Sequence, residues 1–363
     1  MFVLSDFLIV ISQKNASPIQ VAFSFFNPVL SKEKFIRFLK TCKSTKNPYY
    51  RIREKQYKRH FFHTFIYYST MVNRTIKDKI AQLFQQYQKL SKANTKALHE
   101  IAINEIPEIV YNSNAIENST LTLKDTEEIL IYDQIKKDYN LREVYEAKNL
   151  ANITEKLLKA PDQKLTIELI LTLHKSLLTG IKDDRAGRFR SGKERVQVWN
   201  HLGANPTFVN ELMYELVNQY HKNTNRYFLD NIAYFHAEFE TIHPFCDGNG
   251  RMGRVLINQQ LMKLGYPPIS IPNKSKKSEY YPLFNEYSLK NKYDGFTEIL
   301  ALLLMESLHK RVALLTAKKI ITLNQRTKLN HKNTNSYLNK AKRQTIPAFR
   351  MREKWMISSE FHD

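Results

Sequence analysis

The sequence contains one short segment in which an imidazole, a carboxylate, glycines and guanidinium groups lie close together: residues 243–254, which read HPFCDGNGRMGR. A helix is expected to end near residue 242, and the glycines at positions 248 and 250 allow a tight turn with positive φ. A new helix then starts near Gly250. Its free N–H groups and the positive end of its dipole point into the turn, which predicts an anion-binding site there.

The charged side chains of this segment suit an oligophosphate ligand. Arg251 and Arg254 are three residues apart and rise from the same helical face, so that two guanidinium groups can hold phosphate oxygens in bidentate fashion. Asp247 is a hard oxygen donor, suited to a Mg²⁺ ion that is bound to those phosphates. His243, at the other lip of the turn, can accept a proton from a hydroxyl near pH 7. Together these groups predict phosphoryl or nucleotidyl transfer.

The same residues also allow other interpretations. Cys246 lies three residues from His243, as in a Cys–His nucleophile, but no Asn or Asp that would orient the histidine is identifiable. His236, Glu240, His243 and Asp247 could form a metal cluster, but there is no His-Glu-x-x-His pattern and no Cys/His ligand spacing. The plain alternative is a helical corner with one buried histidine and two surface arginines, which the complete twelve-residue pattern disfavours.

The segment resembles the signature of the Fic family, His-x-Phe-x-Asp/Glu-Gly-Asn-Gly-Arg-x-x-Arg, with every fixed position present. The resemblance covers roughly residues 110–315. It implies the all-helical Fic fold. It also implies the typical activity of the family, which is the transfer of AMP from ATP to a Tyr, Ser or Thr hydroxyl of a target protein (AMPylation).

The resemblance also implies a role for each fixed residue. His243 would be the general base that takes the proton from the target hydroxyl, Phe245 would anchor the loop in the core, and Asp247 would bind Mg²⁺. Five residues would hold the phosphates of ATP, the first three at the α-phosphate as charge develops and the two arginines at the β- and γ-phosphates: Gly248, Asn249, Gly250, Arg251 and Arg254.

A second pattern lies upstream, where residues 113–118 read SNAIEN. It resembles the inhibitory motif Ser/Thr-x-x-x-Glu-Gly/Asn that many Fic proteins carry. Ser113 and Glu117 are four residues apart and therefore share one helical face. A carboxylate against Arg254 would occupy the cation meant for the γ-phosphate, so that ATP could bind only in an unproductive pose. In some relatives this glutamate also helps a water to remove AMP, so deAMPylation stays an alternative, as does an ordinary solvent-facing glutamate.

Residues 185–210 differ from the helical patterns around them. They contain three glycines, a proline and an alternating run at 195–199, RVQVW, which predicts an extended hairpin or flap. In the Fic family such a hairpin pairs with an extended segment of the target by strand addition. The matching region, about residues 196–208, is expected to dock the target protein. Because main-chain pairing does not depend on side chains, the target and its modified residue cannot be read from it.

The helices that must position these residues follow from hydrophobic periodicity. A clean helical pattern begins at residues 76–84. Further helices are expected between breakers such as Pro161 and Gly180, at residues 141–159, 165–178, 231–242, 250–263 and 294–316. The expected fold is an all-α Fic domain over residues 71–315, with its core at about 165–290, the inhibitory helix on its N-terminal side and a small β-hairpin flap.

Composition excludes several classes of protein. Of the 363 residues 42% are hydrophobic, which is too many for a disordered chain. Two cysteines cannot hold together a secreted disulfide scaffold, so a reducing cytoplasm is expected. No apolar run approaches the roughly 20 residues that span a bilayer. The first eleven residues make a poor signal peptide, because Asp6 interrupts them and no basic region precedes them.

The net charge of +21 comes mainly from the two ends of the chain. Residues 1–70 hold 12 Lys/Arg and 3 Asp/Glu, and residues 316–363 hold 11 and 3. Basic ends favour contact with a polyanion, usually nucleic acid, or are simply solvated. The first 70 residues also mix aromatic and basic residues without periodicity. They are expected to be an extension upstream of a true start at Met71, or else a poorly ordered arm.

Residues 321–361 are expected to form a small separate unit within a module at 316–363. Two short helices at 321–329 and 335–343 precede two short strands at 345–350 and 354–357. This order resembles winged helix-turn-helix modules of the excisionase or MerR type found at the end of some Fic proteins. Three side chains of the second helix would face DNA phosphates or a groove: Lys340, Lys342 and Arg343. The alternative is a basic unit that recognises the target protein or packs on the Fic domain.

The inhibitory helix is also a plausible place for a switch between monomer and homodimer. The sequence does not give the oligomeric state, and it does not locate the adenine pocket. No membrane partner is expected. The sequence therefore predicts a protein adenylyltransferase that is inhibited by Glu117, with ATP as substrate and Mg²⁺ as cofactor. The alternatives are a DNA-associated regulator and a Fic enzyme that works in reverse.

Overall fold

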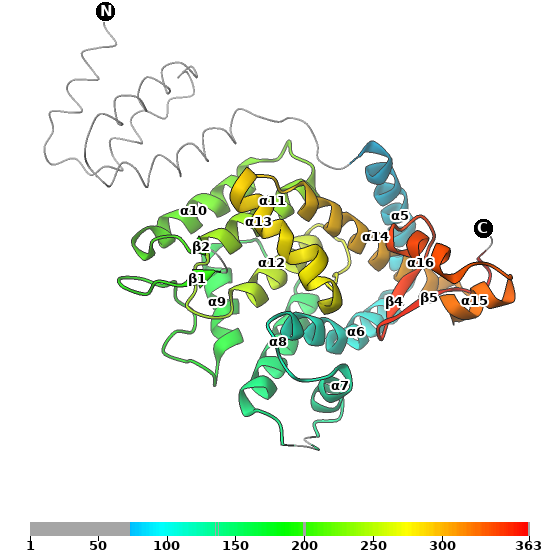
Figure 1. Cartoon of the computed structure of the whole chain (residues 1–363), viewed down its shortest axis with the longest axis horizontal. Helices are drawn as coiled ribbons and strands as arrows, with labels where there is room; N and C mark the ends of the chain where they lie inside the picture. The colour runs from blue at the N-terminus through cyan, green and yellow to red at the C-terminus, as the bar shows by residue number, and fades with distance from the viewer. Residues whose placement is uncertain (1–72, 135, 137, 199–200, 362–363) are drawn as a thin grey trace, which may run out of the picture. The chain divides into compact units, whose positions relative to one another are not determined.

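The computed structural model describes residues 73–361 except Ile135, Lys137, Trp199 and Asn200. The two interpretations of residues 1–70 lie outside this range. The described residues are mostly helical, with a two-stranded hairpin and a three-stranded sheet (Figure 1). This confirms the predicted fold class. Among the described helices, none combines the length and the apolar character needed to cross a bilayer.

Helices that enclose the motif segment make up most of the described chain. They are α5 (Arg74–Ala93), α6 (Thr95–Ile116), α7 (Leu123–Ile131), α8 (Leu141–Lys159), α9 (Ile167–Leu178), α10 (Pro206–Lys222), α11 (Phe228–Ile242), α12 (Asn249–Lys263), η1 (Asn273–Ser275), η2 (Lys276–Tyr280), α13 (Tyr281–Lys290) and α14 (Asp294–Thr316). The predicted bounds of α8 and α14 match the structure at both ends. The predicted starts of α9, α11 and α12 are off by one to three residues.

Side chains at the helix starts explain several of these bounds. Thr166 accepts a hydrogen bond from the backbone N of Leu169, so that α9 begins two residues later than the periodicity indicates. Asn140 caps α8 in the same way through the N of Arg142. Asn205 caps α10, and a proline at the first helical position favours the start there. Local capping chemistry, rather than the apolar pattern, therefore sets where these helices begin.

The core is centred on α11, which packs against α10, α12 and α14 (Figure 1). Its aromatic residues Phe235 and Phe239 are fully buried. Helix α12 is buried on nearly all sides, and its residue Asn258 forms a pair of hydrogen bonds with the backbone of Ile269, at 2.9 Å each. The two helices on either side of the motif loop are therefore fixed in the core, which holds the loop between them.

The C-terminal residues form a small unit of two helices and a sheet. Its elements are β3 (Ile320–Thr322), α15 (Leu323–Leu329), α16 (Thr334–Lys342), β4 (Phe349–Met351) and β5 (Lys354–Ser358). The sheet order is β3-β5-β4, and all pairs are antiparallel. Strand β3 was not expected from the sequence: the predicted first helix included Ile321 and Thr322. These two residues pair with β5 instead, and Thr322 caps α15 through Gln325.

This unit has its own small core and also packs on the helical domain. Residues such as Leu323, Tyr337 and Ile357 form the inner cluster. Toward the domain, Arg350 forms a bidentate ion pair with Glu306 of α14. The described residues accordingly hold together as one unit by their contacts, and the C-terminal sheet lies beside α14 and α6 (Figure 1).

Candidate active site

The motif segment forms a tight loop between α11 and α12, and a buried arginine fixes its first residue. His243 has φ of 52°, in the left-handed region that residues other than glycine seldom adopt. Arg190 Nε donates to the backbone O of His243 at 2.7 Å, and its guanidinium donates to that of Ile242 at 2.9 Å. Arg190 is 1% exposed and also donates to the carbonyls of Ala204 and Glu194. This one side chain therefore ties the flap to the loop.

The middle of the loop is closed by the side chain of Asn249. Its Oδ1 accepts from the N of Phe245 at 2.9 Å, and its Nδ2 donates to the O of Phe245 at 2.8 Å. Gly248 precedes it with φ of 78°, and a Cβ there would lie 3.0 Å from Leu177. Both ends of the Asn249 amide are used inside the loop. The backbone N–H groups at the start of α12 are therefore the donors left for an anion.

Phe245 and His174 form the floor of the loop. Phe245 is fully buried, as expected, and stacks on the imidazole of His174 with ring centroids 3.6 Å apart. His174 Nε2 lies 3.1 Å from the backbone O of Asp247, and its Nδ1 accepts from the N of Gly187 at 3.1 Å. Burial lowers the pKa of His174 to about 4. A neutral histidine therefore links the motif loop to the base of the flap.

The imidazole of His243 lies beside Glu240, one helical turn earlier. Its Nδ1 is 3.3 Å from the backbone O of Glu240 and 3.7 Å from the carboxylate Oε2. A proton held on Nδ1 by these oxygens leaves the lone pair on Nε2. This is the tautomer that a general base requires.

Asp247 is surrounded by cations. Its Oδ2 accepts from Lys182 Nζ at 2.7 Å and from Arg142 Nη2 at 2.9 Å, and its Oδ1 lies 3.5 Å from Arg251. Burial opposes ionisation, but Lys182, Arg251 and Arg142 outweigh it and lower the pKa of Asp247 to about 2. The carboxylate is thus fully ionised at neutral pH and is held at the rim of the loop.

Arg251 is buried between two carboxylates. Its Nη1 lies 3.0 Å from Glu146 Oε1 and its Nη2 lies 3.5 Å from Asp247. The same oxygen of Glu146 accepts from Arg142 Nε at 2.9 Å. The Nε of Arg251 is buried and has no hydrogen-bond partner among the residues that the structure describes. The two carboxylates therefore fix the orientation of the Arg251 guanidinium, and its Nε–H remains available to donate to a ligand.

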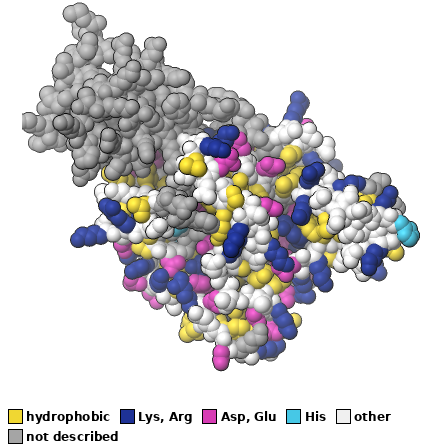
Figure 2. All heavy atoms as spheres, viewed as in Figure 1, with side chains coloured by type: hydrophobic (Ala, Val, Ile, Leu, Met, Phe, Trp, Pro, Cys, Tyr) yellow, Lys and Arg dark blue, Asp and Glu magenta, His cyan; other side chains and the backbone are white. Residues whose placement is uncertain are grey.

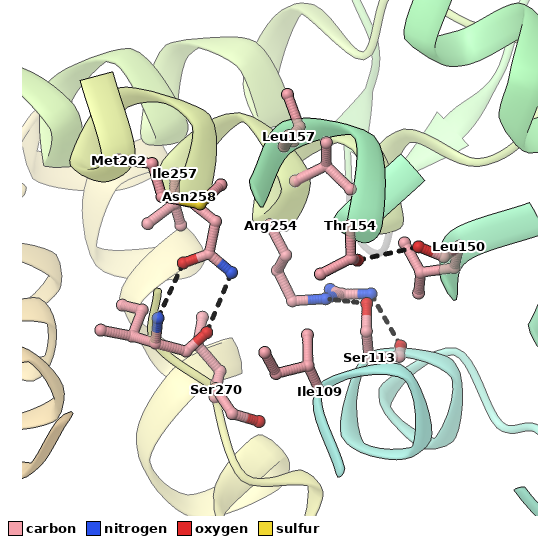
Figure 3. Close-up of a pocket in the computed structure, with 13 residues that line it drawn as sticks. Ile109, Ser113, Leu150, Thr154, Leu157, Arg254, Ile257, Asn258, Met262 and Ser270 are labelled. Atoms are coloured by element: carbon pink, nitrogen blue, oxygen red, sulfur yellow. Dashed lines mark hydrogen bonds between the residues drawn. The ribbon is translucent and has the colours of Figure 1, made fainter. Parts of the chain in front are cut away.

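Arg254 points from α12 toward α6, where the second sequence motif meets it (Figure 3). Arg254 Nε donates to Ser113 Oγ at 2.9 Å and Nη2 donates to the backbone O of Ser113 at 2.9 Å. Nη2 also donates to Glu117 Oε1 at 2.7 Å. Burial alone would lower the pKa of Arg254, but Glu117 and its other neighbours raise it overall. The structure thus brings Ser113, Glu117 and Arg254 together.

The Glu117 carboxylate also covers the start of α12. A Cβ built on Gly250 would overlap Glu117 Oε1, so the carboxylate lies directly against the backbone there. The free N–H groups and the positive dipole end at this position are the predicted anion site. In this structure the anion next to that site is therefore the glutamate of α6 itself.

Lys276 of η2 and Tyr281, the first residue of α13, hold the end of α6 in this position. Lys276 Nζ donates to the backbone O of Ala115 at 2.9 Å, of Ile116 at 3.2 Å and to Asn118 Oδ1 at 2.9 Å. Tyr281 Oη donates to the same Ile116 carbonyl at 2.7 Å. A cation at the C-terminal carbonyls of a helix also interacts favourably with the helix dipole. Glu117 therefore projects from a helix end that is itself anchored.

The flap is a short antiparallel hairpin of β1 (Gln197–Val198) and β2 (His201–Leu202). Its turn, residues 199–200, lies outside the described residues. At its base the N of Gly203 donates to the O of Val196, and the N of Ala204 donates to the O of Ile242 next to the motif loop. The predicted hairpin over 196–208 is thus joined by its backbone to the end of α11.

The two alternative chemistries gain no support from the site. Burial raises the pKa of the Cys246 thiol, whereas a nucleophilic cysteine needs a lowered pKa. The described residues contain no group of three or more His, Cys, Asp or Glu side chains that could hold a metal ion between them. The Asp247 carboxylate by itself remains as the metal ligand that the sequence predicts.

Sequence reasoning missed five residues that shape the site: Arg142, Glu146, His174, Lys182 and Arg190. A histidine on the apolar face of a helix, such as His174, is usually a core residue, so its position gave no signal. Arg190 binds backbone carbonyls, which leave no trace in side-chain types. Arg142 lies 105 residues before its partner Asp247. No short-range spacing could reveal that pair.

We predict that His174 makes the folded state sensitive to mild acid. The pKa of His174 is about 4 in the folded chain, whereas an unfolded histidine titrates near 6.5. The unfolded state therefore binds more protons between these values. The contribution of His174 to the free energy of unfolding is complete above about pH 6.5 and falls as the pH drops, by on the order of 3 kcal/mol. Urea unfolding at several pH values between 7.5 and about 4.5 measures this loss.

The matched variant is His174→Gln, whose amide can keep hydrogen bonds to both partners without taking up a proton. We expect it to lose less stability on acidification than the wild type. His99→Gln, at an exposed position of α6, is expected to follow the wild type. An equal loss in all three chains would show that another group causes the acid sensitivity.

Comparison with known proteins agrees with this geometry. The family model described as the Fic/DOC family matches residues 164–261. Two curated relatives are the proteins named protein adenylyltransferase Fic of Drosophila persimilis, which is 34% identical over 177 residues, and of Drosophila melanogaster, which is 33% identical over 177 residues. The match covers 47% of this chain and 34% and 35% of these relatives. The chain thus spans about a third of their length.

Solved structures show the same fold. A Fic domain containing signaling protein from Bacteroides thetaiotaomicron matches with a TM-score of 0.58 at 24% identity, over 65% of this chain and 96% of that one. Fic-1 from C. elegans matches with a TM-score of 0.56 at 23% identity, over 65% of this chain and 71% of that one. These structures show that the chain shares their fold, and the family model shows that residues 164–261 are similar to the Fic/DOC family.

Proposed function

We propose that this chain is a cytoplasmic protein adenylyltransferase that transfers AMP from ATP to a Tyr, Ser or Thr hydroxyl of a target protein, and that Glu117 holds it inactive. The observation that carries the proposal is the 2.7 Å contact between Glu117 and Arg254 at the start of α12. Such a contact is expected where a carboxylate competes with a phosphate for one cation. The name adenylyltransferase, which the matched relatives bear, supports the same reaction.

In the proposed reaction His243 takes the proton of the target hydroxyl. The hydroxyl oxygen then bonds to the α-phosphorus of ATP, the bond from this phosphorus to the bridging oxygen breaks, and pyrophosphate leaves. Glu240 supports the base, because its oxygens lie 3.3 Å and 3.7 Å from His243 Nδ1 and can keep the proton on that nitrogen. The N–H groups at the start of α12 stabilise the negative charge that develops at phosphorus.

The phosphates of ATP have a matching set of donors. Arg251 has a buried Nε without a partner among the described residues, and Arg254 becomes available when Glu117 leaves. The backbone of Gly248 and Gly250 borders the same place. Asn249 then acts by shaping the loop, since its amide is bound to the backbone of Phe245.

The fit of a Mg²⁺ ion rests on Asp247. Its carboxylate is ionised, and Mg²⁺ sites in nucleotide enzymes often use one carboxylate together with the phosphates. Lys182 and Arg142 bind one oxygen of this carboxylate in the structure, so a Mg²⁺ ion held by Asp247 would compete with them for it. When bound, Mg²⁺ would neutralise phosphate charge and help pyrophosphate to leave.

The target protein is proposed to dock on the flap, residues 196–208. Backbone joins the base of this hairpin to the end of α11, directly before His243. A target segment that adds as a further strand would therefore bring its hydroxyl to a fixed distance from the base. The reverse reaction, deAMPylation, is the alternative for the same site, with the Glu117 carboxylate orienting a water.

We predict that removing the Glu117 carboxylate activates the enzyme. In Mg²⁺ and ATP labelled at the α-phosphate, Glu117→Gly should label itself or an added lysate roughly 10- to 100-fold more than the wild type, because Arg254 is then open to the γ-phosphate. Adding His243→Ala should reduce the label by about 10²-fold or more, since the base is lost. Glu117→Gln, which keeps the volume of the side chain, tests whether the charge is what inhibits.

Nucleotide binding is the control for this experiment, measured as the Kd of ATP for each variant. A Glu117→Gly chain that binds ATP and transfers no AMP to itself or to the lysate would contradict the proposed reaction. Release of AMP from a previously labelled protein by the wild type, and not by Glu117→Gly, would favour deAMPylation.

A second candidate function is DNA binding by the C-terminal unit. Helix α16 exposes one polar face made of Asn335, Ser336, Asn339, Lys342 and Arg343. Asn side chains read adenine and basic side chains read guanine or phosphate. Lys340 does not belong to this face, because its ammonium lies 5.0 Å from the ring centroid of Tyr337. Lys and Arg side chains also stand out on the unit in Figure 2.

The wing of this unit is not available in the same way. The hairpin turn between β4 and β5 points its backbone at α6: the N of Arg352 and the N of Glu353 lie 3.4 Å and 3.5 Å from the carboxylate of Glu108. Both residues have positive φ, so that their N–H groups converge on the anion. Any DNA contact is therefore proposed for α16 and not for the wing.

We predict that, if α16 binds DNA, Lys342→Ala and Arg343→Ala each weaken the binding of the full chain to a short duplex. Each change should reduce the slope of log K against log salt by about 1, the share of one phosphate contact. Fluorescence anisotropy at several salt concentrations measures this, and Lys96→Ala, at an exposed position of α6, is the control. An unchanged slope in both variants would exclude α16 and favour a protein partner or mere packing.

A homodimer is proposed through an apolar patch at the adjoining ends of α7 and α8. Its members are 42–64% exposed: Ile131, Tyr132, Leu141 and Tyr145. Large apolar side chains that are exposed to solvent in this way favour contact with a second surface. We predict that the wild type dimerises with concentration in sedimentation and that Leu141→Asp stays monomeric, whereas Leu289→Asp, at an 82% exposed position, behaves as the wild type. A wild type that is monomeric at all concentrations would contradict this.

A further inference from the structure

A buried polar cluster lies between His243 and Arg254, and the steps proposed above leave most of it without a role. His236 and Glu240 are one turn apart on α11 and are 1% and 7% exposed. Tyr280, the last residue of η2, is 1% exposed and faces them. Burying three polar side chains together is costly unless their hydrogen bonds are satisfied.

At the Arg254 end the proton positions follow from the partners. Burial raises the pKa of Tyr280, against the effect of Arg254, so the phenol keeps its proton. Arg254 can only donate, so Tyr280 Oη accepts from that side and turns its proton to His236 Nε2, 2.7 Å away. Burial, with Arg254, lowers the pKa of His236 to about 3. The neutral His236 therefore carries its one proton on Nδ1.

In the middle of the cluster two polar atoms share one gap. His236 Nδ1 and Glu240 Oε1 are both buried, and neither has a hydrogen-bond partner in the described part of the chain. Both lie against Gly253: a Cβ there would overlap Glu240 Oε1 and lie 3.0 Å from His236 Nδ1. The donor on His236 and the acceptor on Glu240 thus both border the space beside Gly253, although no hydrogen bond joins them in this structure.

At the His243 end of the cluster, the second carboxyl oxygen of Glu240 faces the imidazole of His243. Glu240 Oε2 lies 3.7 Å from His243 Nδ1, next to the backbone O of Glu240 at 3.3 Å. An ionised Glu240 can accept from His236 with Oε1 and from His243 with Oε2. A protonated Glu240 has a hydroxyl in place of one of these acceptors.

The charge on Glu240 depends on its surroundings. Burial raises the pKa of Glu240 to about 8, Arg254 opposes this and Glu117 adds to it. Departure of the Glu117 carboxylate removes one of the two causes and favours ionisation. Titratable and charged groups from every neighbouring element surround Glu240. They are His236 of α11, His243 of the loop, Arg254 of α12, Tyr280 at the end of η2, Tyr281 at the start of α13, and Glu117 directly after α6.

We propose that Glu240 is a positioning residue: its carboxylate holds the proton of His243 on Nδ1, and through His236 and Tyr280 it links that base to the phosphate-binding Arg254. The role of this residue rests on the proposed adenylyl transfer, in which His243 is the base. His243 carries its proton on Nδ1 in all molecules, and so can act as the base, only when Glu240 is ionised. Transfer should therefore rise as the pH is raised through the range in which Glu240 loses its proton.

The first test is the pH profile of AMP transfer in the Glu117→Gly chain, with and without Glu240→Gln. We expect the Gln variant to lower kcat at about pH 8 by tenfold or more and to leave the KM for ATP within about twofold, because no phosphate-binding residue changes. We also expect the rise with pH near neutrality to disappear. Glu298→Gln, at an exposed position of α14, is the control and should keep the full profile.

The second test does not depend on activity. The ¹⁵N spectrum of the histidine rings in the full wild-type chain, with His243 assigned through His243→Ala, reports which nitrogen carries the proton. We expect Nδ1–H in the wild type above about pH 8 and a mixture of both tautomers in Glu240→Gln. If the Gln variant does not fold, Glu240→Asp takes its place. We expect Glu240→Asp to lower kcat and to keep the rise of AMP transfer with pH.

The outcomes separate the two proposals. The same pH profile, or the same tautomer of His243, in the wild type and in Glu240→Gln would overturn the positioning role. A Glu117→Gly chain that transfers no AMP would remove the proposed function, and the ring spectrum would then decide the placement of the His243 proton by itself.

Discussion

The rest of the site depends on one buried positive charge. Arg254 is 7% exposed, on a helix that is enclosed in the core. A guanidinium at that depth is very costly without a partner, so an anion must always be near it. In this structure Ser113 and Glu117 satisfy it. The state in which Glu117 binds Arg254 is therefore stable for the same reason that a phosphate-bound state would be: each supplies the negative charge that Arg254 requires.

The helix that provides Glu117 is part of the frame of the molecule. Lys276 and Tyr281 hold its last carbonyls, and Glu108, two turns earlier, receives the N–H groups of the C-terminal wing. Glu117 itself is half exposed and only follows the helix end. Its side chain can therefore swing away from Arg254 while α6 stays in place, or the whole helix end can shift if the wing or Lys276 releases it.

The sequence predicted those parts of this site that are encoded by residues close together in the chain. The motif at 243–254, the pair Ser113 and Glu117, the flap and most helix bounds are local patterns, and the structure brings the motif residues together as expected. Sequence reasoning could not find Arg190, whose partners are backbone carbonyls, and it placed Glu240 only in a candidate metal cluster, because the buried space beside Gly253 exists only in the folded chain. Strand β3 was missed for a related reason, because three residues become a strand only when β5 pairs with them.

The position of Gly253 illustrates why such features stay hidden. It stands at a variable position of the family signature, so the motif alone assigns it nothing. In the folded chain it touches Glu240 and His236, and any side chain would displace the carboxyl group beside His243. Glycine is thus required at position 253 because of Glu240 on α11, thirteen residues earlier in the sequence, and not because of a residue within the motif. A residue at a variable position can therefore be as constrained as a fixed one when its neighbour across two packed helices is polar and buried.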